Sequence, residues 1–481
     1  MKCDIGLIGL AVMGENLVIN MERNGFSVCV FNRDTAKVDR FVNGRAAGRN
    51  ILGAQSLEQL VASLKAPRKI MLMIKAGNAV DAVIGSLIPL LDKGDIIIDG
   101  GNSNYQDTNR RAELVENAGL YYIGAGVSGG EEGALNGPSI MPGGSQAAWP
   151  LVAPIFQSIC AKVDGQPCCQ WLSGGGSGHF VKMVHNGIEY GDMQLICEAY
   201  AIMRDLLGLD AQSIGEIFAD WNKGRLSSYL IEITANIFTA KAEDGMPLVD
   251  KIQDTAGQKG TGKWTGFAAL ELGVPLTLIT DSVFARCLSA MKDERVNAAG
   301  QFEKVPKKLD YDPKQVILML ENSLYAAKIV SYAQGCALLK AANSHYGWDL
   351  DLSQIAKIWR GGCIIRSGFL DDIAKAYEQT PELENLMLAG YFKNALGQAS
   401  QDFRAVVVLG ALNGTALPAM SAALAYFDGY KTARLPANLL QAQRDYFGAH
   451  QFERTDKNPG EFFHFNWTGK GGETASSEYS L

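Results

Sequence analysis

The stretch Ile8-Gly9-Leu10-Ala11-Val12-Met13-Gly14 decides the fold of the N-terminal part of the chain. It joins an apolar strand, expected over residues 3–10, to a helix expected over residues 15–24. In that context a Gly-x-Ala-x-x-Gly loop binds the pyrophosphate of a dinucleotide, because its small residues let the backbone and the amides of the helix N-terminus approach the phosphates. We therefore expect the cofactor to contact Gly9, Leu10, Ala11, Val12, Met13 and Gly14.

Further apolar runs occupy residues 27–31, 69–74, 95–99 and 120–124, with helical segments between them. Strands that are apolar without alternation are typical of a parallel sheet covered by helices on both faces. Residues 1–176 are therefore predicted to form an α/β, Rossmann-type, doubly wound domain that binds the cofactor.

Beyond residue 176 the strand pattern ends, and apolar residues recur at three- and four-residue spacing, for example over residues 188–207 and 316–339. A faint repeat at an offset of 140 residues matches Gln194 with Gln334, Ala201 with Ala341, Ser227 with Ser367, Leu230 with Leu370, and Ile233 with Ile373. We predict a large all-helical domain over residues 177–434, built from a duplicated helical unit.

The last stretch, from about residue 456, is rich in glycine, serine and asparagine and contains several aromatic residues, Phe462, Phe463, Phe465 and Trp467. Such a segment cannot build its own core. It is either a disordered chain end or an arm that docks on another subunit, and the aromatic residues favour the arm. Residues 435–481 are therefore predicted to form a C-terminal tail that reaches a partner subunit.

The bulk composition argues against several classes of protein. The formal net charge of −7 argues against general nucleic-acid binding. No apolar run reaches the length of a membrane span. The nine cysteines lack metal-ligand spacing, and Cys168 and Cys169 are adjacent. We expect a cytoplasmic protein with no metal site and no disulfide scaffold.

The end of the second strand indicates which dinucleotide is bound. Asn32 stands where NAD-binding domains carry a carboxylate for the ribose hydroxyl, and Arg33 and Lys37 can pair with a 2′-phosphate. This favours NADP over NAD. Asp34 is discordant beside a phosphate, unless its role is to cap the next helix.

A second stretch, residues 182–190, places Lys182, Asn186 and Glu189 on one helical face. Polar residues on one face usually form a solvated surface, but the apolar neighbours of this face indicate a buried helix. Burial lowers the pKa of a lysine and raises that of a carboxyl. Lys182 and Glu189 are therefore a candidate base and acid for an oxidation that also moves protons.

Two glycine-rich loops, residues 124–130 and 99–103, end strands on the same edge as the cofactor loop, where ligands of open α/β sheets bind. Their glycines either cradle a ligand or serve turns alone. Additional positive groups for an anionic substrate are Lys259, Arg286, Arg444 and His450. Residues 260–263 superficially suggest a nucleotide P-loop, but the spacing is wrong and no strand precedes them.

With these residues in place, the chain closely resembles the 6-phosphogluconate dehydrogenase family, the decarboxylating enzymes of the oxidative pentose phosphate pathway, within the β-hydroxyacid dehydrogenase superfamily. The resemblance runs from the first strand to the tail. It rests on long blocks over residues 97–103, 126–133, 178–192, 257–264, 359–366 and 443–450.

The resemblance implies a homodimer in which the tail completes the partner's active site. It implies Lys182 as the base for the 3-hydroxyl of 6-phosphogluconate and Glu189 as the acid that protonates carbon 1. The sugar acid would be held by Asn102, Ser128, Gly129, Gly130, His185 and Asn186, and its phosphate by Tyr190, Lys259, Thr261 and Arg286, joined across the dimer by Arg444 and His450. Lys75, Ala76 and Asn102 would complete the NADP site.

Two rival functions share parts of this pattern. Another β-hydroxyacid dehydrogenase would share the fold and the lysine, but a small unphosphorylated acid has no use for the cationic residues. A catalytically silent NADP sensor would keep the glycine loop and lose the acid or the base, and both are present here. The main departure from the family is Asp34, where its members usually carry a small hydroxyl residue.

Overall fold

The computed structural model describes residues 2–471 and 476, and the chain divides after Ala423 into two compact units. The remaining residues of the predicted tail lie outside the described part. Between residues 2 and 471, no helix is both long and apolar enough to cross a membrane.

The first unit begins with a seven-stranded sheet in the order β3-β2-β1-β4-β5-β6-β7. Its strands are β1 (Ile5–Ile8), β2 (Val28–Phe31), β3 (Ile51–Gly53), β4 (Lys69–Leu72), β5 (Ile96–Asp99), β6 (Tyr121–Ser128) and β7 (Ser139–Gly144). The first six are parallel, five of them at predicted positions, but β7 runs antiparallel to β6. The apolar-run criterion missed β3, which is short, and β7, whose Pro142 and glycines interrupt any strand pattern.

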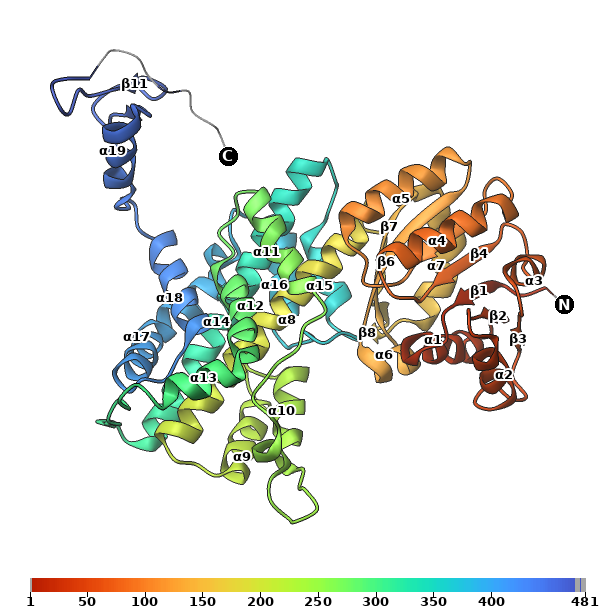
Figure 1. Cartoon of the computed structure of the whole chain (residues 1–481), viewed down its shortest axis with the longest axis horizontal. Coiled ribbons are helices and arrows are strands. Elements are labelled where there is room, and N and C mark those ends of the chain that lie inside the picture. Colours follow the sequence, from red (N-terminus) through yellow and green to blue (C-terminus); the bar gives the residue numbers. More distant parts are fainter. Residues whose placement is uncertain (1, 472–475, 477–481) are drawn as a thin grey trace. The chain divides into compact units, whose positions relative to one another are not determined.

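Helices cover both faces of this sheet (Figure 1). Leu7 and Ile98 belong to the core cluster beneath α1 (Val12–Arg23), α2 (Thr35–Asn43) and α7 (Trp149–Ile159). Ile8 and Ile97 face the other way, toward α3 (Leu57–Ala62), α4 (Asn78–Leu87) and α5 (Tyr105–Asn117). The doubly wound prediction is confirmed, and its physical basis is that both faces of each central strand are buried. The remaining short elements are η1 (Ile88–Leu90), α6 (Gly130–Asn136), η2 (Gln146–Ala148), β8 (Lys162–Val163) and β9 (Gln166–Pro167).

Helices follow the sheet. The first set is α8 (Ser177–Ala201), the π-helical turn η3 (Ile202–Leu206), α9 (Ala211–Trp221), α10 (Tyr229–Thr239), η4 (Leu248–Lys251), α11 (Thr261–Glu271), α12 (Thr277–Ala290) and α13 (Lys292–Ala299). The second is α14 (Pro313–Tyr346), α15 (Leu352–Trp359), α16 (Leu370–Gln379), η5 (Leu386–Leu388), α17 (Gly390–Leu412) and α18 (Pro418–Tyr430).

The two sets correspond at the offset of 140 residues seen in the sequence. Moved by that offset, α9, α10 and α12 fall on α15, α16 and α18, while α8 and α11 fall within α14 and α17. The long helices α8 and α14 pack against each other, and Ser228 and Ser367 form an antiparallel bridge between the sets. The helix order therefore supports a duplicated helical unit.

The second unit contains α19 (Ala437–Gly448) and a short antiparallel pair, β10 (Phe452–Glu453) and β11 (Phe462–Phe463). The expectation that strands stop after residue 176 is therefore wrong for this pair. Fully buried Asp445 organises the described tail, because its carboxylate accepts hydrogen bonds from Trp467 Nε1 at 2.8 Å and from the backbone amides of Phe465 and Gln451 at 3.1 and 2.9 Å. Trp467 and the backbone of Phe465 are thus held to a buried carboxylate, and the rings of Tyr446, Phe452 and Phe465 contact Trp467.

Candidate functional site

A cavity of about 580 Å³ lies in the first unit, where loops at the carboxyl ends of the strands meet α8. The residues that line it and were predicted for the site are Met13, Asn102, Ser128, Gly129, Gly130, Lys182, Asn186, Glu189, Tyr190, Lys259, Thr261 and Arg286. These residues come from segments far apart in the sequence, and the fold gathers them at one place.

Lys182 extends from a helix that is buried over most of its length, as its apolar neighbours predicted. Its side chain is almost fully buried, and Nζ donates to Asn186 Oδ1 at 2.7 Å, one turn along the helix. Burial lowers the pKa of Lys182 below its ordinary value, and the charge of Glu189 opposes that shift. The amine is therefore easier to deprotonate than a solvated lysine, as a general base requires.

His185 supports Lys182 from the same helix. It is completely buried, with Nδ1 at 3.0 Å from Asn186 Oδ1 and 3.2 Å from Lys182 Nζ, and Nε2 at 3.3 Å from Ser128 Oγ. Burial and the neighbouring lysine hold the pKa of His185 well below its ordinary value. These contacts fit a neutral ring that carries its proton on Nδ1 and accepts the Ser128 hydroxyl at Nε2.

Glu189 lies two turns from Lys182, with 22% of its side chain exposed. Burial raises its pKa, the positive charges of Lys182, Arg286 and Lys259 lower it, and the charge of Asp192 raises it. The net shift is upward, so the carboxyl holds a proton at higher pH than a solvated glutamate does. The cavity thus contains a base with a lowered pKa and an acid with a raised one, the environment expected from the sequence.

Close packing of α8 against β6 explains why some residues near the end of β6 are glycines. A Cβ on Gly126 would lie 2.3 Å from Lys182 Cβ, and a Cβ on Gly178 would lie 2.2 Å from Gly124 O. These glycines therefore serve contact between strand and helix, whereas Gly129 and Gly130 line the cavity. The alternative that the glycines serve turns alone is wrong, because some of them permit packing and others face the cavity.

The cationic side of the cavity is built around Tyr190. The Arg286 guanidinium stacks at 3.4 Å from the centre of the Tyr190 ring, which fixes its position while leaving charge toward the cavity. Lys259 is exposed just before α11, and buried Thr261 is the first residue of that helix. Gly262 packs against the Tyr190 ring, where a Cβ would lie 2.6 Å from Cδ2. This glycine therefore serves close packing and is not part of a P-loop.

The dinucleotide loop has the geometry that a phosphate group needs. Gly9 has a φ of +110°, and a Cβ there would lie 2.4 Å from Met73 O. No side chain caps the N-terminus of α1, so its amides stay available to an anion. Asn32 braces the loop by accepting a hydrogen bond from Leu10 N at 3.1 Å.

The predicted 2′-phosphate residues follow β2. Arg33 and Lys37 are exposed, and Asp34 occupies the N-cap position of α2 without a side-chain capping hydrogen bond. Lys75 and Ala76 lie in the loop between β4 and α4, on the same edge of the sheet.

Two predicted phosphate ligands belong to the second unit. Arg444 Nη1 donates to Gln441 Oε1 at 2.9 Å, and the His450 ring packs edge-on against Phe447. Their role in substrate binding stays a prediction.

Five lining residues were not assigned a role from the sequence: Val127, Met193, Gly257, Gln258 and Ile364. Val127, Gly257, Gln258 and Ile364 lie inside the blocks that carry the family resemblance, which was the available signal. Met193 follows Glu189 by four residues, so helical spacing would have placed it on the same face.

The comparisons with known proteins agree with this geometry. Residues 4–173 match the family described as the NAD binding domain of 6-phosphogluconate dehydrogenase, and residues 178–467 match its C-terminal domain. The decarboxylating 6-phosphogluconate dehydrogenase of Treponema pallidum is 59% identical over 100% of both chains, and the human enzyme is 55% identical over 100% of this chain and 99% of its own.

A solved structure of Plasmodium falciparum 6-phosphogluconate dehydrogenase, described in its apo form, with its cofactor NADP+ and with its substrate 6-phosphogluconate, has a TM-score of 0.93 at 45% identity. The alignment covers 97% of this chain and 100% of that one. The chain belongs to the 6-phosphogluconate dehydrogenase family.

Proposed function

We propose that this chain oxidises and decarboxylates 6-phospho-D-gluconate to D-ribulose 5-phosphate and CO2, with reduction of NADP to NADPH. The observation that carries the proposal is the pairing of Lys182 and Glu189 in one cavity whose wall also presents Arg286 and Lys259. An amine and a carboxyl with oppositely shifted pKa values suit a reaction that first removes a proton and later returns one. Family membership over the full chain supports this function.

NADP fits the loop after β1, where the small residues and the uncapped helix N-terminus can accept a pyrophosphate. When bound, the cofactor accepts the hydride from carbon 3 of the sugar acid. We assign Arg33 and Lys37 to its 2′-phosphate, because both are exposed beside the end of β2.

Lys182 performs the first proton transfer. Its neutral amine takes the proton of the 3-hydroxyl as the hydride leaves carbon 3, which gives a ketone β to the carboxylate. The protonated amine then donates to the ketone oxygen as the bond to the carboxylate breaks, so that CO2 leaves and an enediol remains. Asn186, whose Oδ1 accepts a hydrogen bond from Nζ, keeps the amine oriented within the cavity.

Glu189 performs the last proton transfer. Its carboxyl protonates carbon 1 of the enediol while the neutral amine of Lys182 takes back the proton of the adjacent enol hydroxyl, which gives the ketose product. This step needs the acid form, and the raised pKa of Glu189 favours it. Asn102, Ser128, Gly129 and Gly130 would hold the sugar acid, and the Arg286 and Lys259 side chains would hold its phosphate.

The direct test is a steady-state assay of the purified chain with 6-phosphogluconate and NADP, with CO2 and NADPH measured together. Equal amounts of the two products support the proposal. Turnover of 3-hydroxyisobutyrate in preference to 6-phosphogluconate, or NADPH without CO2, would refute it. Lys182→Met should lower kcat by at least ~100-fold with near-normal affinity for NADP, which matches the loss of a general base. Replacing NADP by NAD in the same assay measures the cofactor preference.

We also propose a homodimer in which the tail of one subunit completes the site of the other. Large apolar side chains are exposed on α12 (Phe284 and Leu288) and on α19 (Leu439, Leu440 and Phe447). Exposed apolar surfaces of this kind mark protein interfaces. The family resemblance assigns Arg444 and His450 to the substrate phosphate across that interface.

Complementation between two inactive variants tests the shared site. Lys182→Met and Arg444→Ala proteins, each assayed at limiting substrate, should both be impaired. If the site is shared, dissociating and mixing them forms heterodimers in which one site carries both substitutions and the other carries neither, so activity returns. Mixed dimers without any gain in activity would show that each site is built from a single chain.

We also propose that the protein is located in the cytoplasm. All nine cysteines are free thiols, which suits a reducing cytoplasm. Localisation of the tagged protein in fractionated cells tests this assignment.

A further inference from the structure

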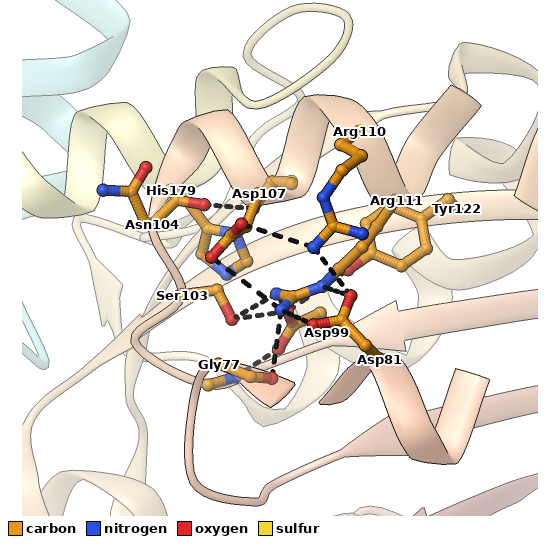
Figure 2. A network of polar contacts seen from close by, with 12 residues as sticks. Gly77, Asp81, Asp99, Ser103, Asn104, Asp107, Arg110, Arg111, Tyr122 and His179 are labelled. Carbon is orange, nitrogen blue, oxygen red and sulfur yellow. Dashed lines mark hydrogen bonds and ion pairs between the residues drawn. The ribbon is translucent and has the colours of Figure 1, made fainter. Parts of the chain in front are cut away.

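A fully buried arginine joins two loops at the edge of the sheet where the ligands are expected. Arg111 lies on α5, and none of its side chain is exposed. Nε and Nη2 donate to Asp81 Oδ1 and Oδ2 at 2.9 and 2.8 Å, and Nη2 also donates to Gly77 O at 3.1 Å. Nη1 faces the other way, 3.4 Å from Ser103 Oγ and 3.5 Å from Asp99 Oδ2 (Figure 2).

The first pair of partners belongs to the segment that links β4 to α4. Gly77 has a φ of +94° and precedes the first residue of α4, and Asp81 lies in the first turn of that helix. Lys75 and Ala76, which the family resemblance assigns to the cofactor site, immediately precede Gly77. The bidentate contact to Asp81 therefore fixes the start of α4, and with it the end of the cofactor segment.

The second pair belongs to the segment between β5 and α5. The buried carboxylate of Asp99 accepts from Ser103 Oγ at 2.6 Å, from Gly101 N at 3.1 Å and from the Tyr122 hydroxyl at 3.2 Å. These contacts bracket Asn102, the residue of this segment that lines the cavity. The conformation that presents Asn102 is thus held by Asp99, whose negative charge faces Arg111.

A guanidinium suits this position for a geometric reason. Its planar fork can make the bidentate contact to Asp81 and reach the opposite segment at the same time, whereas a lysine ammonium offers one compact charge. A buried ion pair adds little net stability compared with apolar packing, so its value lies in the fixed geometry. The neighbouring Arg110 also contacts Asp81, at 2.8 Å, but 54% of its side chain is exposed.

We propose that Arg111 is a positioning residue that sets the segments of residues 75–77 and 100–103 at a fixed separation, so that cofactor and substrate are held in register for hydride transfer. This inference rests on the proposed function. Its consequence is that Arg111 affects binding of both ligands and kcat, while Asp81 affects the cofactor side alone.

The test compares four proteins in steady-state kinetics and in direct NADP titrations: wild type, Arg111→Lys, Asp81→Asn and the control Arg110→Ala. Arg111→Lys should lower kcat by about 10- to 100-fold and raise the KM of both ligands, because a displacement of about 1 Å costs up to about 100-fold. Asp81→Asn should raise the KM and Kd of NADP by about 5-fold or more, while the KM of the sugar acid stays within about two-fold of wild type. Arg110→Ala should leave kcat, both KM values and the Kd of NADP within about two-fold of wild type.

If the Asp81 contact were merely structural, Asp81→Asn would lower the melting temperature without raising the KM of NADP relative to that of the sugar acid, and that result would overturn the proposal. So would Arg111→Lys with kcat and both KM values within about two-fold of wild type. If Arg111→Lys does not fold, Asp81→Asn decides alone, because an unchanged NADP affinity in that variant overturns the proposal. A wild-type protein that binds NADP but does not turn over 6-phosphogluconate would refute the proposed function, and the NADP titrations would still test the Asp81 arm.

Discussion

Replacing Gly126 by alanine should move Lys182, the proposed catalytic base, while leaving the fold intact. A Cβ on Gly126 would lie 2.3 Å from Lys182 Cβ and 2.8 Å from Lys182 Cγ, whereas ordinary contact begins at 3.4 Å. Helix α8 must therefore retreat from β6 by about 1 Å, and a displacement of that size at a reacting group costs about 100-fold in rate. Overpacking of this kind costs about 1–3 kcal/mol of stability, which a domain stable by about 5–15 kcal/mol tolerates.

The assay for Gly126→Ala is kcat with saturating NADP and 6-phosphogluconate, measured together with the melting temperature. The matched control is Gly174→Ala, in the loop that leads into α8, where an added Cβ would meet nothing within 4 Å. We expect the control to keep wild-type turnover, and the KM of NADP to stay near normal in both variants because the dinucleotide loop follows β1. A folded Gly126→Ala protein whose kcat lies within about three-fold of wild type would refute the reasoning, since Lys182 would then tolerate displacement.

Three further outcomes follow from the same geometry. Lys182→Met should raise the melting temperature at pH 7. Because the pKa of Lys182 is lower in the folded protein than in the unfolded protein, burial of the charged amine costs stability at pH values below the unfolded pKa. The gain in melting temperature should therefore shrink as the pH rises toward 10.5. Equal differences in melting temperature across that range would contradict the burial argument. Lys328→Met should destabilise the protein by about 3–5 kcal/mol in urea unfolding, because it leaves the carboxylate of Asp192 buried without its cation, and adding Asp192→Asn should recover part of that loss. Arg33→Ala should lower kcat/KM with NADP by about 10- to 100-fold, the equivalent of about 1.5–3 kcal/mol for a charged hydrogen bond, with little change for NAD; an equal loss with both cofactors would remove Arg33 from the 2′-phosphate site.

Local patterns in the sequence were sufficient for the architecture. Apolar runs between helical segments predicted five of the six parallel strands, because a strand buried on both faces has no polar alternation. The glycine loop predicted the tight turn between β1 and α1, where an uncapped helix begins. The spacing of Lys182, Asn186 and Glu189 placed these residues on one face, because the helical period alone determines which side chains share a face. The 140-residue offset likewise anticipated the repeated helix order.

Only the tertiary structure determined the roles of several residues that local sequence patterns do not identify. The sequence places Gly126 in a glycine-rich loop, and only the packing of α8 on the sheet reveals that a Cβ on Gly126 or on Gly178 would collide. Arg111 and Asp99 are ordinary charged residues along the chain, and their partners come from segments folded against them. The strand β7 was missed for the same reason, since its pairing with β6, rather than its own composition, makes it a strand. Side-chain period is a property of a few consecutive residues, whereas burial, close approach and charge pairing depend on segments that meet only after folding, and no local pattern encodes those distances.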